Sequence, residues 1–88
     1  MGKEKALEGK QIGVVSHYFS DIGVMAIDLM GKVRVGDKLR IKGNTTDFEQ
    51  VINSMQIDKE SVEKAGRGKS IGIKVGDKVR VGDKVYKI

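Results

Sequence analysis

Residues 33–42 read Val-Arg-Val-Gly-Asp-Lys-Leu-Arg-Ile-Lys, and this stretch decides the fold class. Its second half, Lys38–Lys42, alternates strictly, so that Leu39 and Ile41 point to one side and the cations to the other. This alternation is typical of a β-strand with one face on an apolar core, because successive side chains of a strand point to opposite faces. The preceding Gly36-Asp37 pair is typical of a turn, since glycine accepts a positive φ and the carboxylate accepts turn N–H groups.

Part of this stretch recurs later in the chain. Val-Arg-Val-Gly-Asp-Lys occurs at 33–38 and at 79–84, and Val-Gly-Asp-Lys occurs once more at 75–78. The spacing is too irregular for a solenoid. We expect each Gly-Asp to form a turn before a new strand. The aspartates are then structural, because no nucleophile or base accompanies them at a fixed spacing.

The rest of the chain also has a β pattern. Beside 38–42 and a short stretch at 32–35, strands are predicted at 11–18, 22–30, 48–57, 70–75 and 84–88. The apolar residues of 48–57 depart from period 2, which indicates a bulged strand. Their spacing also fits a helix, but Asn53 and Ser54 disfavour one. The only helical candidate is 59–65, which is long enough for a single turn. We therefore expect an all-β fold, a small closed six-stranded antiparallel β-barrel over 9–88 with at most one short helical turn, after a flexible leader at 1–8.

Composition excludes several classes of function. The chain has 88 residues, no cysteine and a single histidine, His17, so disulfides and thiolate metal sites are impossible. Gly68-Lys69-Ser70 is not a phosphate-binding loop, because position 63 is Glu63 where that motif needs glycine. No apolar run could span a bilayer. We expect a cytoplasmic protein that is not an enzyme, with no catalytic residue, cofactor, metal, small-molecule substrate or membrane contact.

The charge is basic, with 17 Lys and Arg against 12 Asp and Glu and a net charge of +5. Such a balance favours polyanions through counterion release. The same residues equally fit a solvated Lys- and Glu-rich surface, because the acidic residues are interspersed. Few aromatic side chains are available for stacking, so phosphate contacts are the expected mode. The candidate nucleic-acid-binding residues are Lys10, Tyr18, Arg34, Lys38, Arg40, Lys42, Arg67 and Lys69.

Several segments together resemble a known domain. Residues 33–41 resemble the V-x-V-G-D-x-V-x-I segment of the second domain of translation elongation factor Tu and its relatives. Residues 54–73 are similar to that domain's S-I-x and V-x-x-A-x-x-G-x-x-V-G pattern, and 81–85 to its closing R-G-D-V-L element. The resemblance covers about residues 9–88. It implies a closed six-stranded barrel, and it implies no GTPase activity because the GTPase domain is not part of it.

The resemblance implies a binding module. In elongation factors this domain helps to hold the aminoacylated end of tRNA, and in other translational GTPases it contacts the small ribosomal subunit. Similar barrels also occur at the C-terminus of collagenase-like peptidases. Our first hypothesis is a module that contacts RNA or the ribosome through a basic face. The alternative is a protein–protein adaptor that docks on a separate enzyme or GTPase, with Ile22, Met25 and Met30 as candidates for an exposed apolar patch.

Overall fold

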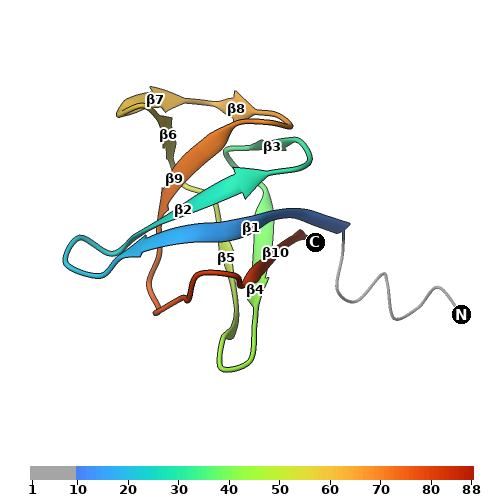
Figure 1. Ribbon diagram of the computed structural model, residues 1–88. Helices are drawn as coiled ribbons and strands as arrows, with labels where there is room; N and C mark the ends of the chain where they lie inside the picture. Colours follow the sequence, from blue (N-terminus) through green and yellow to red (C-terminus); the bar gives the residue numbers. More distant parts are fainter. Residues whose placement is uncertain (1–9) are drawn as a thin grey trace, which may run out of the picture.

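The computed structural model describes residues 10–88 as strands, turns and bends, without a helix in that range (Figure 1). The predicted leader at 1–8 lies outside the described residues. The strands are β1 (Lys10–Phe19), β2 (Val24–Leu29), β3 (Val33–Arg34), β4 (Lys38–Lys42), β5 (Asp47–Val51), β6 (Met55–Ile57), β7 (Glu60–Val62), β8 (Lys64–Ala65), β9 (Ser70–Lys74) and β10 (Lys84–Lys87). The all-β class is therefore confirmed, and the bounds of β4 are those predicted.

The main sheet is a curled half-barrel rather than a closed barrel. Its eight strands have the order β5-β4-β10-β1-β2-β9-β6-β7, and β3 and β8 form a separate two-stranded sheet. The expected closed six-stranded barrel is wrong in strand number and in closure. Between β5 and the end of β9 there is no backbone ladder. There the Gln50 side chain bridges the gap, donating from Nε2 to the Lys74 carbonyl at 2.7 Å and accepting the Gly76 N–H at 3.4 Å.

The repeated hexapeptide contains the same four-residue turn at both of its occurrences, at 34–37 and at 80–83. In each turn the aspartate N–H, from the fourth residue, donates to the arginine carbonyl of the first residue at 3.0 Å. The third residue of the turn is a glycine with φ of 101° or 97°. The aspartate Oδ2 accepts the arginine backbone N–H at 3.0 Å or 2.8 Å. A positive φ at the third position is the requirement of a type II turn, which explains the glycine. The shorter repeat Val-Gly-Asp-Lys at 75–78 differs. Gly76 has no positive φ, and no strand begins between this repeat and Lys84.

The segment 48–57 is two strands at distant places in the sheet, so the prediction of one bulged strand is wrong. Ile52 directly follows β5 and is 1% exposed. Its N–H donates to the Asp37 carbonyl at 2.9 Å, and its carbonyl accepts the Gly36 N–H at 2.8 Å. Pairing with the β3–β4 turn removes Ile52 from the β5 ladder. The chain then crosses to β6, beside β9.

The helical turn expected at 59–65 is also wrong, because this segment contains β7 and β8. A two-residue turn, Asp58-Lys59, joins β6 to β7, with Ile57 paired to Glu60. Both turn residues have a positive φ, 52° and 69°. Two consecutive positive values are typical of a type I′ hairpin turn, whose twist matches that of the flanking strands. This turn usually contains glycine or asparagine, and neither is present here.

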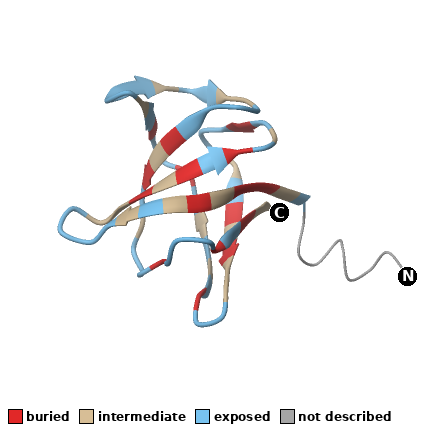
Figure 2. Ribbon diagram, in the orientation of Figure 1, coloured by how far each residue is buried: buried red, intermediate tan, exposed pale blue. Residues whose placement is uncertain are grey.

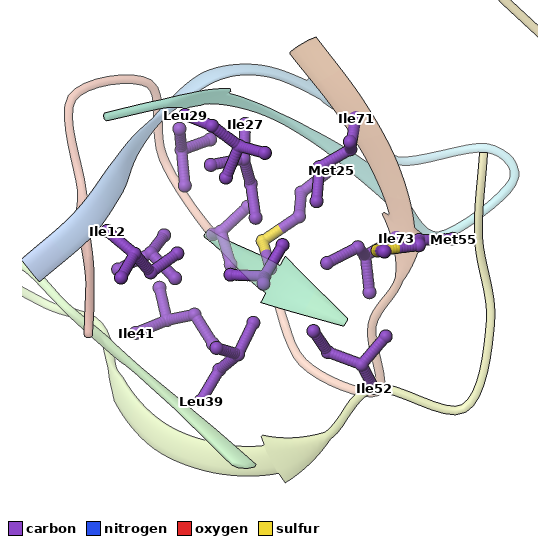
Figure 3. Packing of buried hydrophobic residues seen from close by; sticks show 14 residues of the cluster. Ile12, Met25, Ile27, Leu29, Leu39, Ile41, Ile52, Met55, Ile71 and Ile73 are labelled. Carbon is purple, nitrogen blue, oxygen red and sulfur yellow. The ribbon is translucent and has the colours of Figure 1, made fainter. Parts of the chain in front are cut away.

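The inner face of the half-barrel is the core. Figure 2 shows buried residues alternating with intermediate or exposed ones along β2, β4 and β9, and Figure 3 shows the apolar side chains converging from these strands. Among residues 10–88, fourteen apolar residues form this cluster, including Leu39 and Ile41 at 0% exposure, as predicted. Burial of such side chains contributes about 1.5–3 kcal/mol each relative to exposure, so the core is the main source of stability.

Candidate functional site

An open groove of about 770 Å³ lies between the small β3–β8 sheet and the end of β10. Its apolar lining comes from Val33, Ile57 and Ala65, one residue each from β3, β6 and β8. Its only carboxylate among the described residues is Asp37. Its cationic residues are Lys32, Arg34, Lys64, Lys69 and Lys87. We call this surface the basic groove.

Strand pairing brings these cations together from distant parts of the chain. In the antiparallel β3–β8 pair, Val33 is opposite Ala65 and Arg34 is opposite Lys64. The pair is extended by the Val35 N–H, which donates to the Glu63 carbonyl at 2.9 Å. Residues directly opposite in such a ladder have Cβ atoms about 4.5–5.5 Å apart. Arg34 and Lys64, which both line the groove, therefore project from directly opposite positions of the two strands.

The carboxylate of Asp37 is already engaged. Its Oδ2 accepts the Arg34 backbone N–H at 3.0 Å and lies 4.0 Å from Lys87 Nζ. Lys87 Nζ also donates to the Lys32 carbonyl at 3.3 Å. Within residues 10–88 the other four cationic side chains of the basic groove, those of Lys32, Arg34, Lys64 and Lys69, form no ion pair. The groove thus carries an excess of positive charge that the described residues do not balance.

The predicted cations of β4 lie on a different surface, where acidic residues of β5 pair with them. Lys38 Nζ is 3.3 Å from Glu49 Oε1. Arg40 donates two hydrogen bonds to Asp47, at 3.0 Å and 3.1 Å. These hydrogen bonds lower the pKa of the Asp47 carboxyl below its ordinary value of 3.8, and the charges of Arg40 and Lys42 act in the same direction. This face is therefore largely neutralised within the sheet.

The remaining predicted residues are dispersed. Lys10 and Tyr18 stand near opposite ends of β1, about 26 Å apart at about 3.3 Å per residue. Tyr18 is half-buried and packs against the core. Arg67 is exposed in the turn between β8 and β9. Only Arg34 and Lys69 belong to the basic groove. Sequence reasoning missed Lys32, Lys64 and Lys87, because only contacts between distant segments bring them together: the β3–β8 pairing for Lys64, and the contacts of Lys87 with Lys32 and Asp37.

The apolar patch expected for an adaptor is not formed by its three candidates. Met25 is fully buried in the core, whereas Ile22 and Met30 are 58% and 49% exposed. The two exposed residues stand beyond opposite ends of β2. Ile22 instead lies in the β1–β2 turn beside Phe19, whose ring stacks on His17 with 5.7 Å between centroids. Ile22 and Phe19 are therefore exposed apolar residues at the β1–β2 turn, 58% and 44% exposed.

In residues 10–88 no group of three or more His, Cys, Asp and Glu side chains is placed to hold a metal ion. No helix long and apolar enough to cross a membrane occurs among the same residues.

The comparisons with known sequences point to peptidases. No protein-family model matches the chain. It is 39% identical over 77 residues to an uncharacterized protease of Methanocaldococcus jannaschii, a match that covers 86% of this chain and 19% of that protein. It is 36% identical over 87 residues to a collagenase of Porphyromonas gingivalis, covering 97% of this chain and 23% of that protein. The chain thus spans about a fifth of the length of these curated relatives.

Solved structures share the fold. The chain is similar to the C-terminal domain of a Geobacillus thermoleovorans protein described as a U32 peptidase, with a TM-score of 0.84 and 20% identity. That match covers 89% of this chain and 99% of the domain. The chain is also similar to part of a bacterial selenocysteine-specific elongation factor, with a TM-score of 0.70 and 23% identity over 91% of this chain and 15% of that one.

These matches correct the functional predictions. The likeness to an elongation-factor domain holds at the level of the fold. The expectations of a translation-related module and of a protein that is not an enzyme are contradicted, because the curated relatives are named as a protease and a collagenase. The relatives favour instead the alternative, a protein–protein adaptor barrel that docks on an enzyme, over the translation-related module.

Proposed function

We propose that this chain is an accessory domain of a peptidase, and that it contacts the peptidase body or the polypeptide on which the peptidase acts. One observation carries the proposal. The sequence matches cover 86% and 97% of this chain but only 19% and 23% of the protease and the collagenase. A match of that kind is typical of one module within a larger protein.

The structural comparison supports the same division into modules. Nearly all of a separately crystallised peptidase C-terminal domain, 99%, is matched by this chain. A half-barrel with its own apolar cluster of fourteen residues can be such a unit, because a domain needs a core of its own. Accessory domains act through their surfaces, and the basic groove is a described surface that carries unbalanced positive charge.

A domain exchange tests the proposal. Three forms of the P. gingivalis collagenase are compared: the intact protein, the protein without the segment that matches this chain, and a chimera with residues 10–88 in place of that segment. We expect the truncated form to lose gelatin hydrolysis or gelatin binding, and the chimera to recover a substantial part of it. The readouts are the initial rate of gelatin hydrolysis and retention on immobilised gelatin.

A second chimera is the matched control. It carries the structurally similar elongation-factor barrel, which shares the fold but comes from a protein with another role. Recovery by residues 10–88 and not by the control barrel supports a peptidase-specific surface. Equal activity of the truncated and intact collagenase, or equal recovery by both barrels, would overturn the proposal.

A further inference from the structure

The arrangement of cations in the basic groove is unfavourable without an anionic partner. Arg34 and Lys64 are directly opposite in the β3–β8 ladder, and both line the groove. Like charges at directly opposite positions destabilise a strand pair. Lys32 and Lys69 add to the same surface, while Asp37, its one carboxylate from the described part of the chain, is held by Lys87 and by a backbone N–H. An incoming anion would meet, on both strands of the small sheet, cations that no residue of 10–88 pairs.

The lining of the groove selects the class of anion. Its apolar residues, Val33, Ile57 and Ala65, are aliphatic, and none of the described residues that line it is aromatic. Single-stranded nucleic acids are usually held by aromatic stacking in addition to phosphate contacts. A groove with both cations and aliphatic side chains instead matches an acidic polypeptide, which presents carboxylates next to apolar side chains of its own. A volume of about 770 Å³ lies within the range of ligand pockets and suits a few residues of such a segment.

We propose that the basic groove binds an acidic polypeptide segment, with Arg34 and Lys64 contacting its carboxylates and the half-buried Ile57 and Ala65 contacting its apolar side chains. Arginine offers a planar fork of donors for two carboxylate oxygens, and lysine acts as a point charge beside it. The inference deepens the proposed function and rests on it only for the origin of the segment, in the peptidase body or in its substrate.

The test uses the 88-residue chain and a fluorescein-labelled peptide of alternating Glu and Leu. The control peptide has Gln in place of every Glu. We expect saturable binding of the acidic peptide, measured by fluorescence anisotropy at low ionic strength, and weakening as salt screens the charges. Chemical-shift changes of backbone amides should cluster on β3, β8 and the end of β10. The Gln peptide should bind at least tenfold more weakly.

Three variants separate a specific groove from general positive charge. Lys64→Glu places an acid opposite Arg34. It should raise the melting temperature by replacing a repulsive pair with an attractive one, and should abolish peptide binding. Arg34→Gln should weaken binding about 5- to 10-fold. Lys78→Gln removes one exposed charge outside the groove and should leave binding within about twofold of the unchanged protein.

Specific outcomes would overturn the inference. One is the absence of binding at low salt, and another is equal weakening by Lys78→Gln and Arg34→Gln. Tighter binding of an oligouridylate of equal charge would assign the groove to nucleic acid instead. If the acidic peptide fails while the collagenase chimera recovers activity, the groove inference is wrong and the proposed function stands.

Discussion

Gly43 should be one of the least replaceable residues of the described chain, although nothing in its backbone conformation requires glycine. It follows β4, and its N–H donates to the Thr46 carbonyl at 2.7 Å. Its φ is not positive. A Cβ added at this position would overlap Asp83 Oδ1 and lie 2.7 Å from Asp83 Cγ. Asp83 is only 5% exposed, and its Oδ2 accepts the Arg80 N–H at 2.8 Å. Gly43→Ala must therefore displace a buried carboxylate that holds a turn together.

The magnitude follows from three contributions. Overpacking of a filled site costs about 1–3 kcal/mol. Loss of a hydrogen bond to a charged group costs about 1.5–3 kcal/mol when it is complete. The alanine restricts the unfolded chain and offsets about 0.4–1 kcal/mol of this loss. With a partial loss of the hydrogen bond, we expect a net loss of about 2–3 kcal/mol in the free energy of unfolding. The whole domain has roughly 4–13 kcal/mol, at about 0.05–0.15 kcal/mol per residue.

The assay is a double-mutant cycle measured by urea unfolding, followed by circular dichroism. The cycle contains Gly43→Ala, Asp83→Ala and the double variant. Once the carboxylate is absent, Gly43→Ala should cost less than about 0.5 kcal/mol, because the added methyl group no longer meets it. The two substitutions should thus be coupled by about 1.5–2.5 kcal/mol, within the range seen for residues in contact.

Gly66→Ala is the matched control for this cycle. No atom lies within 4 Å of a Cβ built at Gly66, and its φ is not positive. We expect this variant to be neutral or more stable by up to about 1 kcal/mol. The reasoning is refuted if Gly43→Ala unfolds within about 0.5 kcal/mol of the unchanged protein, or if its effect adds independently to that of Asp83→Ala.

Three further predictions follow from single contacts. Because the Arg40 hydrogen bonds lower the pKa of Asp47, the ionised form stabilises the fold above pH 4, and this contribution is lost as pH falls through the folded-state pKa. The difference in unfolding free energy between the protein and Asp47→Asn should therefore be present at pH 7 and vanish near pH 2, as measured by urea unfolding. A pH-independent difference would contradict this. Lys59→Gly should raise stability by about 0.5–1 kcal/mol in thermal unfolding, because Lys59 has a φ of 69°, whereas a loss would argue against the left-handed conformation. Gln50→Ala should cost about 1–2 kcal/mol and speed hydrogen exchange of the Gly76 amide, and unchanged exchange would show that this side chain does not bridge the half-barrel.

The candidate site shows how little of a surface can be predicted from residue type. Lys38 and Arg40 belong to the strand with the clearest alternation, and their outward direction was predictable. Their pairing with Glu49 and Asp47 was not, because nothing local indicates which strand lies beside β4. Lys64 was assigned to a helical turn, yet it is the residue that β8 places opposite Arg34.

Local chemistry alone determined the all-β class, the inward direction of Leu39 and Ile41, and the turns at 34–37 and 80–83. A period of two and a glycine at a positive φ are properties of a few consecutive residues. Only the tertiary structure decided the open half-barrel, the division of 48–57 at Ile52 and the basic groove. Each of these depends on backbone or side-chain hydrogen bonds between residues far apart in the chain. A strand's own pattern specifies which side faces the core, and leaves open which strand is its neighbour.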